Sequence, residues 1–307
     1  MQRIVIINGA TASGKTGAAI RLSGRFAGEI VSADSVQVYR YLDIGSAKPT
    51  AAEIAAVPHH LVDMLDPDEP FDAGAFVGAA DPAIADIAKR GLLPYIVGGT
   101  GLYIKALLHG LARVRPPDPD ILAQLQKQGE TLGTAAMHAR LHACDPDAAA
   151  RIHPNDGFRI YRYLEIFEAT GIPMSAHHAA HRFNETRYRY VKIGLDVERT
   201  LLYERINRRV DLMMAEGWVD EVRGVLAKGY DPGLKPLQTI GYRHLCAYLT
   251  GERDLADTVA LIKQDTRRYA KRQLSWLRSD PDIVWIKPEE DDRMADTVEA
   301  FLSDTGR

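Results

Sequence analysis

The sequence predicts an α/β protein with a parallel sheet and a helical insertion. Three observations predict this class. A β-branched run at residues 4–7 leads into a glycine-rich loop and an amphipathic segment, and the same alternation recurs up to residue 110. Residues 120–182 then show helical periodicity with hardly a strand candidate. Because strands that alternate with helices pair in parallel through right-handed crossovers, the first part is expected to be a doubly wound core.

The elements of the first part follow from their apolar patterns. Residues 4–7 are typical of a strand buried on both faces. The segment 15–26 has apolar residues at helical spacing, and 29–32 is again strand-like. A helix over 76–89 and a strand over 93–97 repeat the unit. Three prolines within residues 116–119 cannot continue a helix and predict a linker.

The chain is expected to return to the sheet after the insertion. Residues 190–197 alternate as a strand does, 198–215 and 257–277 are helical, 283–286 form a strand, and a last helix begins near the acidic run 289–292. The predicted division is therefore a first core segment over 1–114, a helical insertion over 115–187, and a core completion with a basic helix over 188–307.

Composition restricts the functional classes. Of 307 residues, 46% are apolar and 26% charged, which is ordinary for a globular protein. The net charge of -3 excludes a general polycation, so any nucleic-acid site must be a local patch. The two cysteines have no metal or disulfide spacing, and no apolar run approaches the ~18 residues of a membrane span. A cytoplasmic location is expected, because the first residues do not resemble a signal peptide either.

The glycine-rich loop carries the strongest motif. It matches G-x-x-x-x-G-K-[ST] and stands between a predicted strand and helix, as a phosphate loop must. Such loops surround phosphate oxygens with backbone N–H groups, while the lysine neutralises charge and the threonine hydroxyl ligates Mg²⁺. The fold is thus a P-loop core like that of nucleoside-triphosphate hydrolases, with a nucleotide or another ligand of at least two linked phosphates bound by Gly9, Ala10, Thr11, Ala12, Ser13, Gly14, Lys15 and Thr16.

A second feature argues against hydrolysis. A nucleotide hydrolase normally has another strand that ends in a magnesium-binding Asp. Here the strand 93–97 ends in Gly98-Gly99-Thr100-Gly101, without an acid. The sequence therefore favours group transfer, in which the bound phosphates leave or are passed on.

Two polar residues follow predicted strands at the edge where open α/β sheets bind ligands. Asp34 is a candidate general base, with a turn or N-cap carboxylate as the alternative. Thr100 can hydrogen-bond a bridging phosphate oxygen, and a plain turn threonine fits its position equally well. The triplet His177, His178 and His181 has helical metal-site spacing, but a polar helix surface is the better account because no acidic or cysteine partner is near.

Several sequence blocks extend beyond the phosphate loop. They are 9–16, 32–39, 43–49, 58–63, 97–103, 153–156, 238–243 and 266–278. In order and over nearly the whole chain, these blocks resemble the tRNA dimethylallyltransferase family, also called tRNA isopentenyltransferases. Several of them are specific to that family rather than to phosphate loops in general.

The resemblance implies a reaction. The family transfers a dimethylallyl group from dimethylallyl diphosphate to N6 of the adenosine 3′ of the anticodon (position 37), with Mg²⁺ held at Thr16. It implies that Asp34 takes the N6 proton, which suits a weakly nucleophilic aromatic amine. It also implies that Lys15, Thr100 and Arg209 stabilise the leaving diphosphate. The family register leaves Arg208 as an alternative to Arg209, and an ordinary exposed helix arginine is a third possibility.

The resemblance also implies a tRNA-binding set. Leu122 stands where some members have an arginine shortly after the linker. A basic face on the last long helix suits a phosphate backbone, although a solvated charged face gives the same pattern. We expect the anticodon stem-loop as partner, no obligate protein partner and a monomer. The implied tRNA-binding residues are Asp34, Ser35, Val36, Gln37, Thr100, Phe158, Arg159, Arg162, Gln238, Gly241, Arg243, Arg267, Lys271 and Arg272.

Three other functions fit parts of the sequence. A small-molecule P-loop kinase would use the loop for ATP, but no nucleotide lid or magnesium-binding acid is recognisable. A transferase that prenylates free adenine nucleotides would have little use for residues 115–185 and the basic helix. A non-catalytic RNA-binding module would bind tRNA without turnover.

Overall fold

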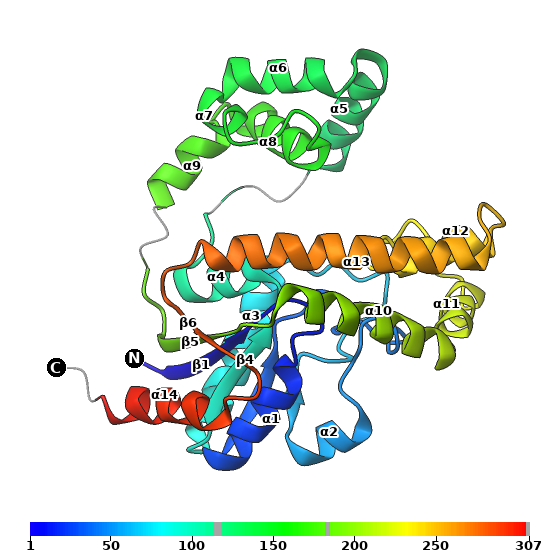
Figure 1. Ribbon diagram of the computed structural model, residues 1–307. Helices are drawn as coiled ribbons and strands as arrows, with labels where there is room; N and C mark the ends of the chain where they lie inside the picture. Colours follow the sequence, from blue (N-terminus) through cyan, green and yellow to red (C-terminus); the bar gives the residue numbers. More distant parts are fainter. Residues whose placement is uncertain (113, 115–117, 182–184, 305–307) are drawn as a thin grey trace. The chain divides into compact units, whose positions relative to one another are not determined.

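Six parallel strands form one sheet, in the order β3-β2-β4-β1-β5-β6 (Figure 1). The structure, a computed structural model, describes residues 1–112, 114, 118–181 and 185–304. The predicted α/β class and parallel sheet are confirmed. The strands are β1 Arg3–Asn8, β2 Gly28–Ser32, β3 His59–His60, β4 Leu93–Gly98, β5 Arg189–Leu195 and β6 Ile283–Ile286.

The strand register places the chemistry-bearing loops at one edge. Asn8 pairs with Gly98 and Gly194, and Ser32 pairs with Val97. Because all pairs are parallel, the loops that follow β1, β2 and β4 leave the sheet at the same edge. This is the edge at which open α/β sheets bind ligands.

One face of the sheet is covered by α1 (Lys15–Arg25) and α14 (Asp291–Ser303) (Figure 1). Both helices present apolar residues to Val5 and Ile7 of β1, in a core that also contains Leu22 and Met294. Burial of such side chains contributes about 1.5–3 kcal/mol each. The position of α1 is thereby fixed, and the phosphate loop that precedes it is fixed as well.

Two further helices, α10 (Arg199–Ala215) and α13 (Leu255–Arg278), pack against each other beside the phosphate loop. Their shared core contains Ile206, Ala270 and Ala10 of the loop itself. The helix predicted at 257–277 begins at Leu255, because the Asp254 side chain caps the backbone N–H of Asp257. The remaining helices of this unit are α2 Ala51–Ala56, α3 Ala73–Lys89, α4 Gly101–His109, α11 Trp218–Ala227 and α12 Tyr242–Leu249.

The chain divides into two compact units, Met1–Leu108 with Arg187–Arg307, and His109–Thr186. The second unit is helical and has its own core around Leu125, Leu141 and Leu164. Among the described residues, no helix combines the length and the apolar character that crossing a membrane requires. The helices of the second unit are α5 Pro119–Leu132, α6 Thr134–Cys144, α7 Pro146–Ala149, α8 Gly157–Thr170 and α9 Met174–His181. The predicted linker prolines at 116 and 117 lie outside the described residues.

Candidate functional site

The phosphate loop joins β1 to α1 in a tight curl. Gly14 adopts a φ of 94° at the N-terminus of α1, which a side chain would strain. A Cβ on Gly9 would lie 2.4 Å from the Ser13 Oγ, so the curl also needs a glycine there. The Lys15 Nζ donates hydrogen bonds to the carbonyl oxygens of Gly9 (3.1 Å) and Ala10 (2.9 Å). The lysine thus lies across the loop.

A glutamine of α13 ties the phosphate loop to the loop after β4. The Thr11 N–H donates to the Gln273 Oε1 at 2.9 Å, and the Gln273 Nε2 donates to the Gly99 carbonyl at 3.1 Å. A Cβ on Gly99 would lie 2.3 Å from that Nε2. Sequence reasoning missed Gln273, although it stands inside the 266–278 block of the resemblance.

A cavity of about 730 Å³ opens over the phosphate loop. Lys15 and Thr16 line it from α1, Arg209 from α10, and Asp34 from the loop after β2. Thr100 is not among its lining residues, whereas the adjacent Gly99 is. Lining residues that sequence reasoning did not identify include Ile44, Lys48, His59, Leu212, Met213 and Tyr269.

The protein environment lowers the pKa values of the two cations that line this cavity, Lys15 and Arg209. Burial, and secondly the nearby Arg209, lower the pKa of Lys15 to about 8, while Asp34 acts in the opposite direction. Burial also lowers the pKa of Arg209, but a guanidinium remains charged. Within the described part of the chain, Arg209 has no hydrogen-bond or ion-pair partner. Two close cations without enough negative charge favour an anionic ligand between them.

The structure distinguishes the two arginine candidates. Arg209 is half-buried and lines the cavity, whereas Arg208 is exposed and does not line it. The α-helix sets this difference, because consecutive residues point about 100° apart around its axis. Of the two, only Arg209 is placed to contact a ligand of the phosphate loop.

Asp34 combines the two roles that its position predicted as alternatives. Its Oδ1 accepts hydrogen bonds from the N–H groups of Val36 (2.8 Å) and Gln37 (3.2 Å), which is a turn cap. The same carboxylate borders the phosphate-loop cavity and a second cavity beside it. One oxygen fixes the carboxylate in place, which leaves Oδ2 to act on a ligand.

The second cavity has a volume of about 380 Å³ and adjoins the first. Asp34, Arg209, Met213 and Tyr269 line both cavities and mark their junction. Burial, with Asp34 adding to it, raises the pKa of Tyr269 to about 12, so its phenol stays neutral and can donate. The predicted tRNA-binding residues that line the second cavity are Asp34, Ser35, Val36, Gln238, Arg243 and Arg272.

Gln37 is already engaged within the fold. Its Oε1 accepts from the Ser32 Oγ at 2.9 Å, and its Nε2 donates to the Ala47 carbonyl at 2.9 Å. It lines the first cavity rather than the second. Gly241 is similarly fixed, because its N–H donates to the His244 Nδ1 at 3.2 Å with φ at 93°.

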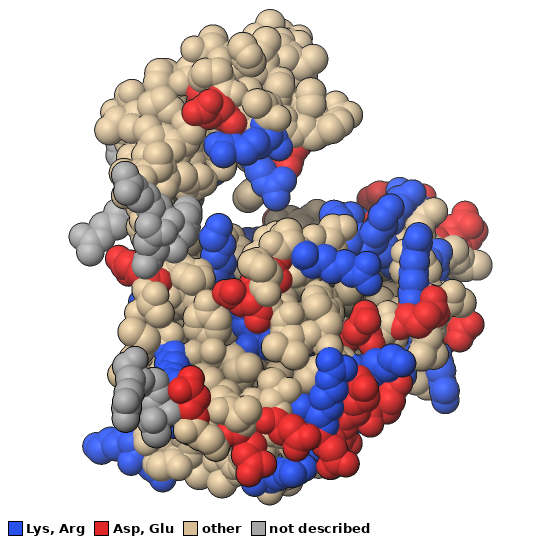
Figure 2. Space-filling view, turned by 60° about the vertical axis from the view of Figure 1, so that its left-hand side comes forward, with Lys and Arg blue, Asp and Glu red and all other residues tan. Residues whose placement is uncertain are grey.

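The basic residues of α13 differ in availability. Arg267 is half-buried and donates to the Asn207 Oδ1 of α10 at 2.5 Å. Lys271 and Arg272 are exposed, and the Arg272 guanidinium lies 5.9 Å from the centre of the Tyr269 ring. Lys and Arg gather along the edge of the larger unit where α13 runs, while acidic and basic side chains mix below it (Figure 2).

The predicted tRNA-binding residues of the helical unit differ in exposure and in their ion pairs. Phe158 is 83% exposed, which is unusual for a large apolar side chain. Arg159 pairs with Asp156 at 2.6 Å, and Arg162 pairs with the buried Glu165. Arg162 therefore contributes to the interior of the unit.

No group of three or more His, Cys, Asp or Glu residues suited to a metal occurs among the described residues. His177 belongs to α9, and His178 packs edge-on against the Tyr163 ring. Thr16 lines the phosphate-loop cavity. A hydroxyl beside bound phosphates suits Mg²⁺, which takes few protein ligands and completes its shell with phosphate and water oxygens.

Fold and site together define a phosphate-loop α/β protein with adjoining ligand cavities. The model of the IPP transferase family matches residues 37–280, and the isopentenyl transferase model matches residues 2–65. The chain belongs to the IPP transferase family, and the resemblance predicted from its sequence is confirmed.

Individual relatives are similar to this chain in sequence and structure over nearly its whole length. A tRNA dimethylallyltransferase of Desulfosudis oleivorans is 52% identical over 94% of this chain and 92% of its own. The crystal structure of a tRNA isopentenylpyrophosphate transferase from Bacillus halodurans is 39% identical, with a TM-score of 0.74 over 98% of this chain and 97% of that one. A eukaryotic dimethylallyltransferase acting on tRNA is 27% identical, with a TM-score of 0.76 over 98% of this chain and 77% of that one.

Proposed function

We propose that this protein transfers a dimethylallyl group from dimethylallyl diphosphate to N6 of the adenosine that follows the anticodon in tRNA. One observation carries the proposal: a phosphate-loop cavity and a second cavity meet at Asp34 and Arg209. A donor diphosphate in the first cavity and a base in the second would bring carbon and nitrogen together at this junction. Membership of the IPP transferase family supports the same reaction.

The cations of the first cavity would stabilise the leaving diphosphate. As the bond between the allylic carbon and oxygen breaks, negative charge builds on the diphosphate. Lys15 and Arg209 line its cavity, and we expect backbone N–H groups of the loop to donate to the phosphate oxygens as in other phosphate loops. When bound at Thr16, Mg²⁺ would supply further charge neutralisation. We also assign Thr100, next to the cavity wall, as a donor to a phosphate oxygen.

Asp34 would accept the proton of the acceptor nitrogen. As N6 forms its bond to carbon, its proton becomes acidic and passes to the free carboxylate oxygen, while diphosphate departs with the electrons of the broken C–O bond. The fixed Oδ1 prevents the carboxylate from rotating away. This step transfers the allyl group without consuming water. It agrees with the sequence after β4, which lacks the magnesium-binding acid that a nucleotide hydrolase normally has.

The acceptor base would enter the second cavity from a flipped nucleotide. The anticodon loop is partly unstacked, which lowers the cost of flipping. Ser35, Val36, Gln238 and Arg243 line this cavity, and the exposed Lys271 offers a phosphate contact. We assign Phe158 and Arg159 of the helical unit to the tRNA as well, because they are exposed. The protein would act as a cytoplasmic monomer.

One experiment tests this function. The protein is incubated with radiolabelled dimethylallyl diphosphate and Mg²⁺, with either tRNA or AMP as acceptor. Label on tRNA at the adenosine 3′ of the anticodon is the expected result. Label on AMP alone would instead identify a nucleotide prenyltransferase, and ³²P transfer from γ-labelled ATP to a metabolite would identify a kinase. Retained tRNA binding without any transfer would identify a non-catalytic module.

Donor affinity is expected to depend on pH through Lys15. Its pKa is about 8 in the free protein, and a bound diphosphate favours the charged lysine. Below pH 8 the lysine is already protonated, so this group adds no pH dependence. Above pH 8 binding must take up a proton, and affinity should fall by up to about tenfold per pH unit.

Titration calorimetry at pH 7 and pH 9, in buffers of different ionisation enthalpy, measures this uptake directly. The donor phosphates contribute little, because a second phosphate pKa lies near ~6. Lys15→Arg is the matched control, since arginine stays charged throughout. Equal proton uptake in both proteins at pH 9 would exclude Lys15 as its source.

A further inference from the structure

A single carboxylate on α11 joins the walls of the two cavities. The Glu221 Oε2 accepts hydrogen bonds from the N–H groups of Asp43 (2.8 Å) and Ile44 (2.6 Å), and its Oε1 accepts from that of Gly45 (3.2 Å). The same Oε1 accepts from the Tyr242 hydroxyl at 2.7 Å. Within the 43–48 turn, Asp43, Ile44, Ser46, Ala47 and Lys48 line the phosphate-loop cavity. Gly45, Ser46 and Tyr242 line the second cavity.

An indole packs the same two segments together. Trp218, at the start of α11, is 2% exposed, and its ring stands edge-on to the Tyr242 ring at 5.7 Å. A Cβ added to Gly45 or to Gly241 would lie 2.1 Å from this indole. Both turns therefore approach the ring as closely as their backbones allow, and α11 fixes their separation.

The 43–48 turn needs an outside support. Ala47 has a φ of 48°, a conformation that costs a non-glycine residue of the order of 1 kcal/mol or more. The Gln37 Nε2 donates to the carbonyls of Ser46 (3.3 Å) and Ala47 (2.9 Å), and the Gln37 N–H donates to Asp34. Hydrogen bonds thus connect the candidate general base to the turn that Glu221 holds.

The Tyr242 hydroxyl remains a donor at all ordinary pH values. Burial, and secondly the charge of Glu221, raise its pKa well above the usual range for tyrosine. A carboxylate that accepts four hydrogen bonds is a strong and specific anchor, because charge-assisted bonds are about twice as strong as neutral ones.

We propose that Glu221 is a positioning residue that locks the donor-cavity turn 43–48 to the acceptor turn 238–243. The role rests on the proposed function, since it assigns donor and acceptor to the two cavities. It predicts that a change made in the acceptor turn alters donor binding even when no RNA is present. Direct contact between Tyr242 and RNA would not produce that effect.

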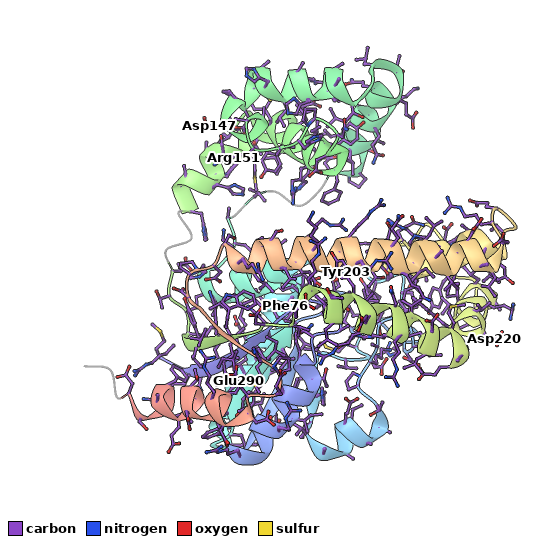
Figure 3. All side chains as sticks on the ribbon, viewed as in Figure 1. Phe76, Asp147, Arg151, Tyr203, Asp220 and Glu290 are labelled. Atoms are coloured by element: carbon purple, nitrogen blue, oxygen red, sulfur yellow. The ribbon has the colours of Figure 1, made fainter. Side chains whose placement is uncertain are left out.

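Glu221→Gln is the first test variant. The amide keeps the size of the side chain but has only one acceptor oxygen and no charge, so it cannot accept from all three backbone N–H groups and the anchor of the turn is weakened. We expect the Kd for dimethylallyl diphosphate without RNA and the KM for tRNA both to rise about tenfold, and kcat to fall about 10- to 100-fold. Asp220→Asn is the matched control. Asp220 lies on α11 (Figure 3), and its side chain is 77% exposed and pairs with Arg223. This control should stay within about twofold of the parent for all three quantities.

Tyr242→Phe is the second test variant and removes only one of the four hydrogen bonds. Its donor Kd without RNA should rise about two- to tenfold, as the loss of one buried hydrogen bond implies. A folded Glu221→Gln protein with unchanged constants would overturn the inference. If that variant does not fold, an unchanged donor Kd in Tyr242→Phe would overturn it. Absence of prenyl transfer by the parent protein would instead overturn the proposed function.

Discussion

Replacing Asp34 by asparagine is expected to lower the turnover of prenyl transfer by about 10²-fold or more, the usual contribution of a positioned general base. The asparagine Oδ1 can still accept the hydrogen bonds from Val36 and Gln37, so the turn should remain intact. Only the proton acceptor is removed. Turnover at saturating donor and tRNA measures the effect, and tRNA affinity should change little.

Asp34→Ala separates the two roles of this residue. Alanine removes both the base and the turn cap, so turnover should fall as in asparagine while tRNA affinity also weakens. If Asp34→Asn kept full turnover and Asp34→Ala did not, Asp34 would act only as a turn residue and not as the base. Such a result would move the proton acceptor to another group or to water, but not to Tyr269 at the same junction, because its raised pKa keeps the phenol protonated.

Replacing Arg209 by glutamine is expected to lower kcat/KM by about 10²- to 10³-fold, comparable with the loss of one preorganised transition-state donor. Arg209 is half-buried at the cavity junction, where charge would develop on the leaving diphosphate. Steady-state kinetics with dimethylallyl diphosphate as the varied substrate measure the change. Because the variant relieves repulsion with Lys15, the pKa of that lysine should rise at the same time.

Arg208→Gln is the control for this variant. The two arginines are adjacent and of equal charge, but Arg208 is exposed to solvent. Its replacement should leave kcat/KM for the donor within about twofold, as for most surface substitutions. Equal losses in the two variants would mean that net charge rather than position explains the effect.

The fold could be predicted because its signals are local. Periodicity predicted β1, α1, β2, α3, β4, β5, α10, α13 and β6, with bounds that differ by at most a few residues. The elements β3, α2, α4, α11 and α12 were not predicted. They are short, with lengths from 2 to 10 residues, so their apolar patterns are weak. The helix α4 begins at Gly101, a glycine that allows the close approach of Trp276.

The candidate site was predictable only where a motif carried it. The phosphate loop and Asp34 follow from their position after strands, and the family resemblance added the remaining residues. Gln273, Tyr269 and Glu221 act through contacts with residues distant in sequence, and no spacing rule reveals such contacts. Arg267 and Arg162, which the resemblance assigns to tRNA binding, illustrate the same limit, because their contacts with Asn207 and Glu165 are visible only in the folded chain.

The sequence by itself determined the sheet, the phosphate loop and the family of this protein, because strand burial, helix periodicity and loop glycines act over a few residues. Only the tertiary structure decided which arginine faces the cavity, that Asp34 both caps a turn and borders two cavities, and that Glu221 connects their walls. Those facts depend on side-chain direction and on packing between distant segments, which are set when the whole chain folds.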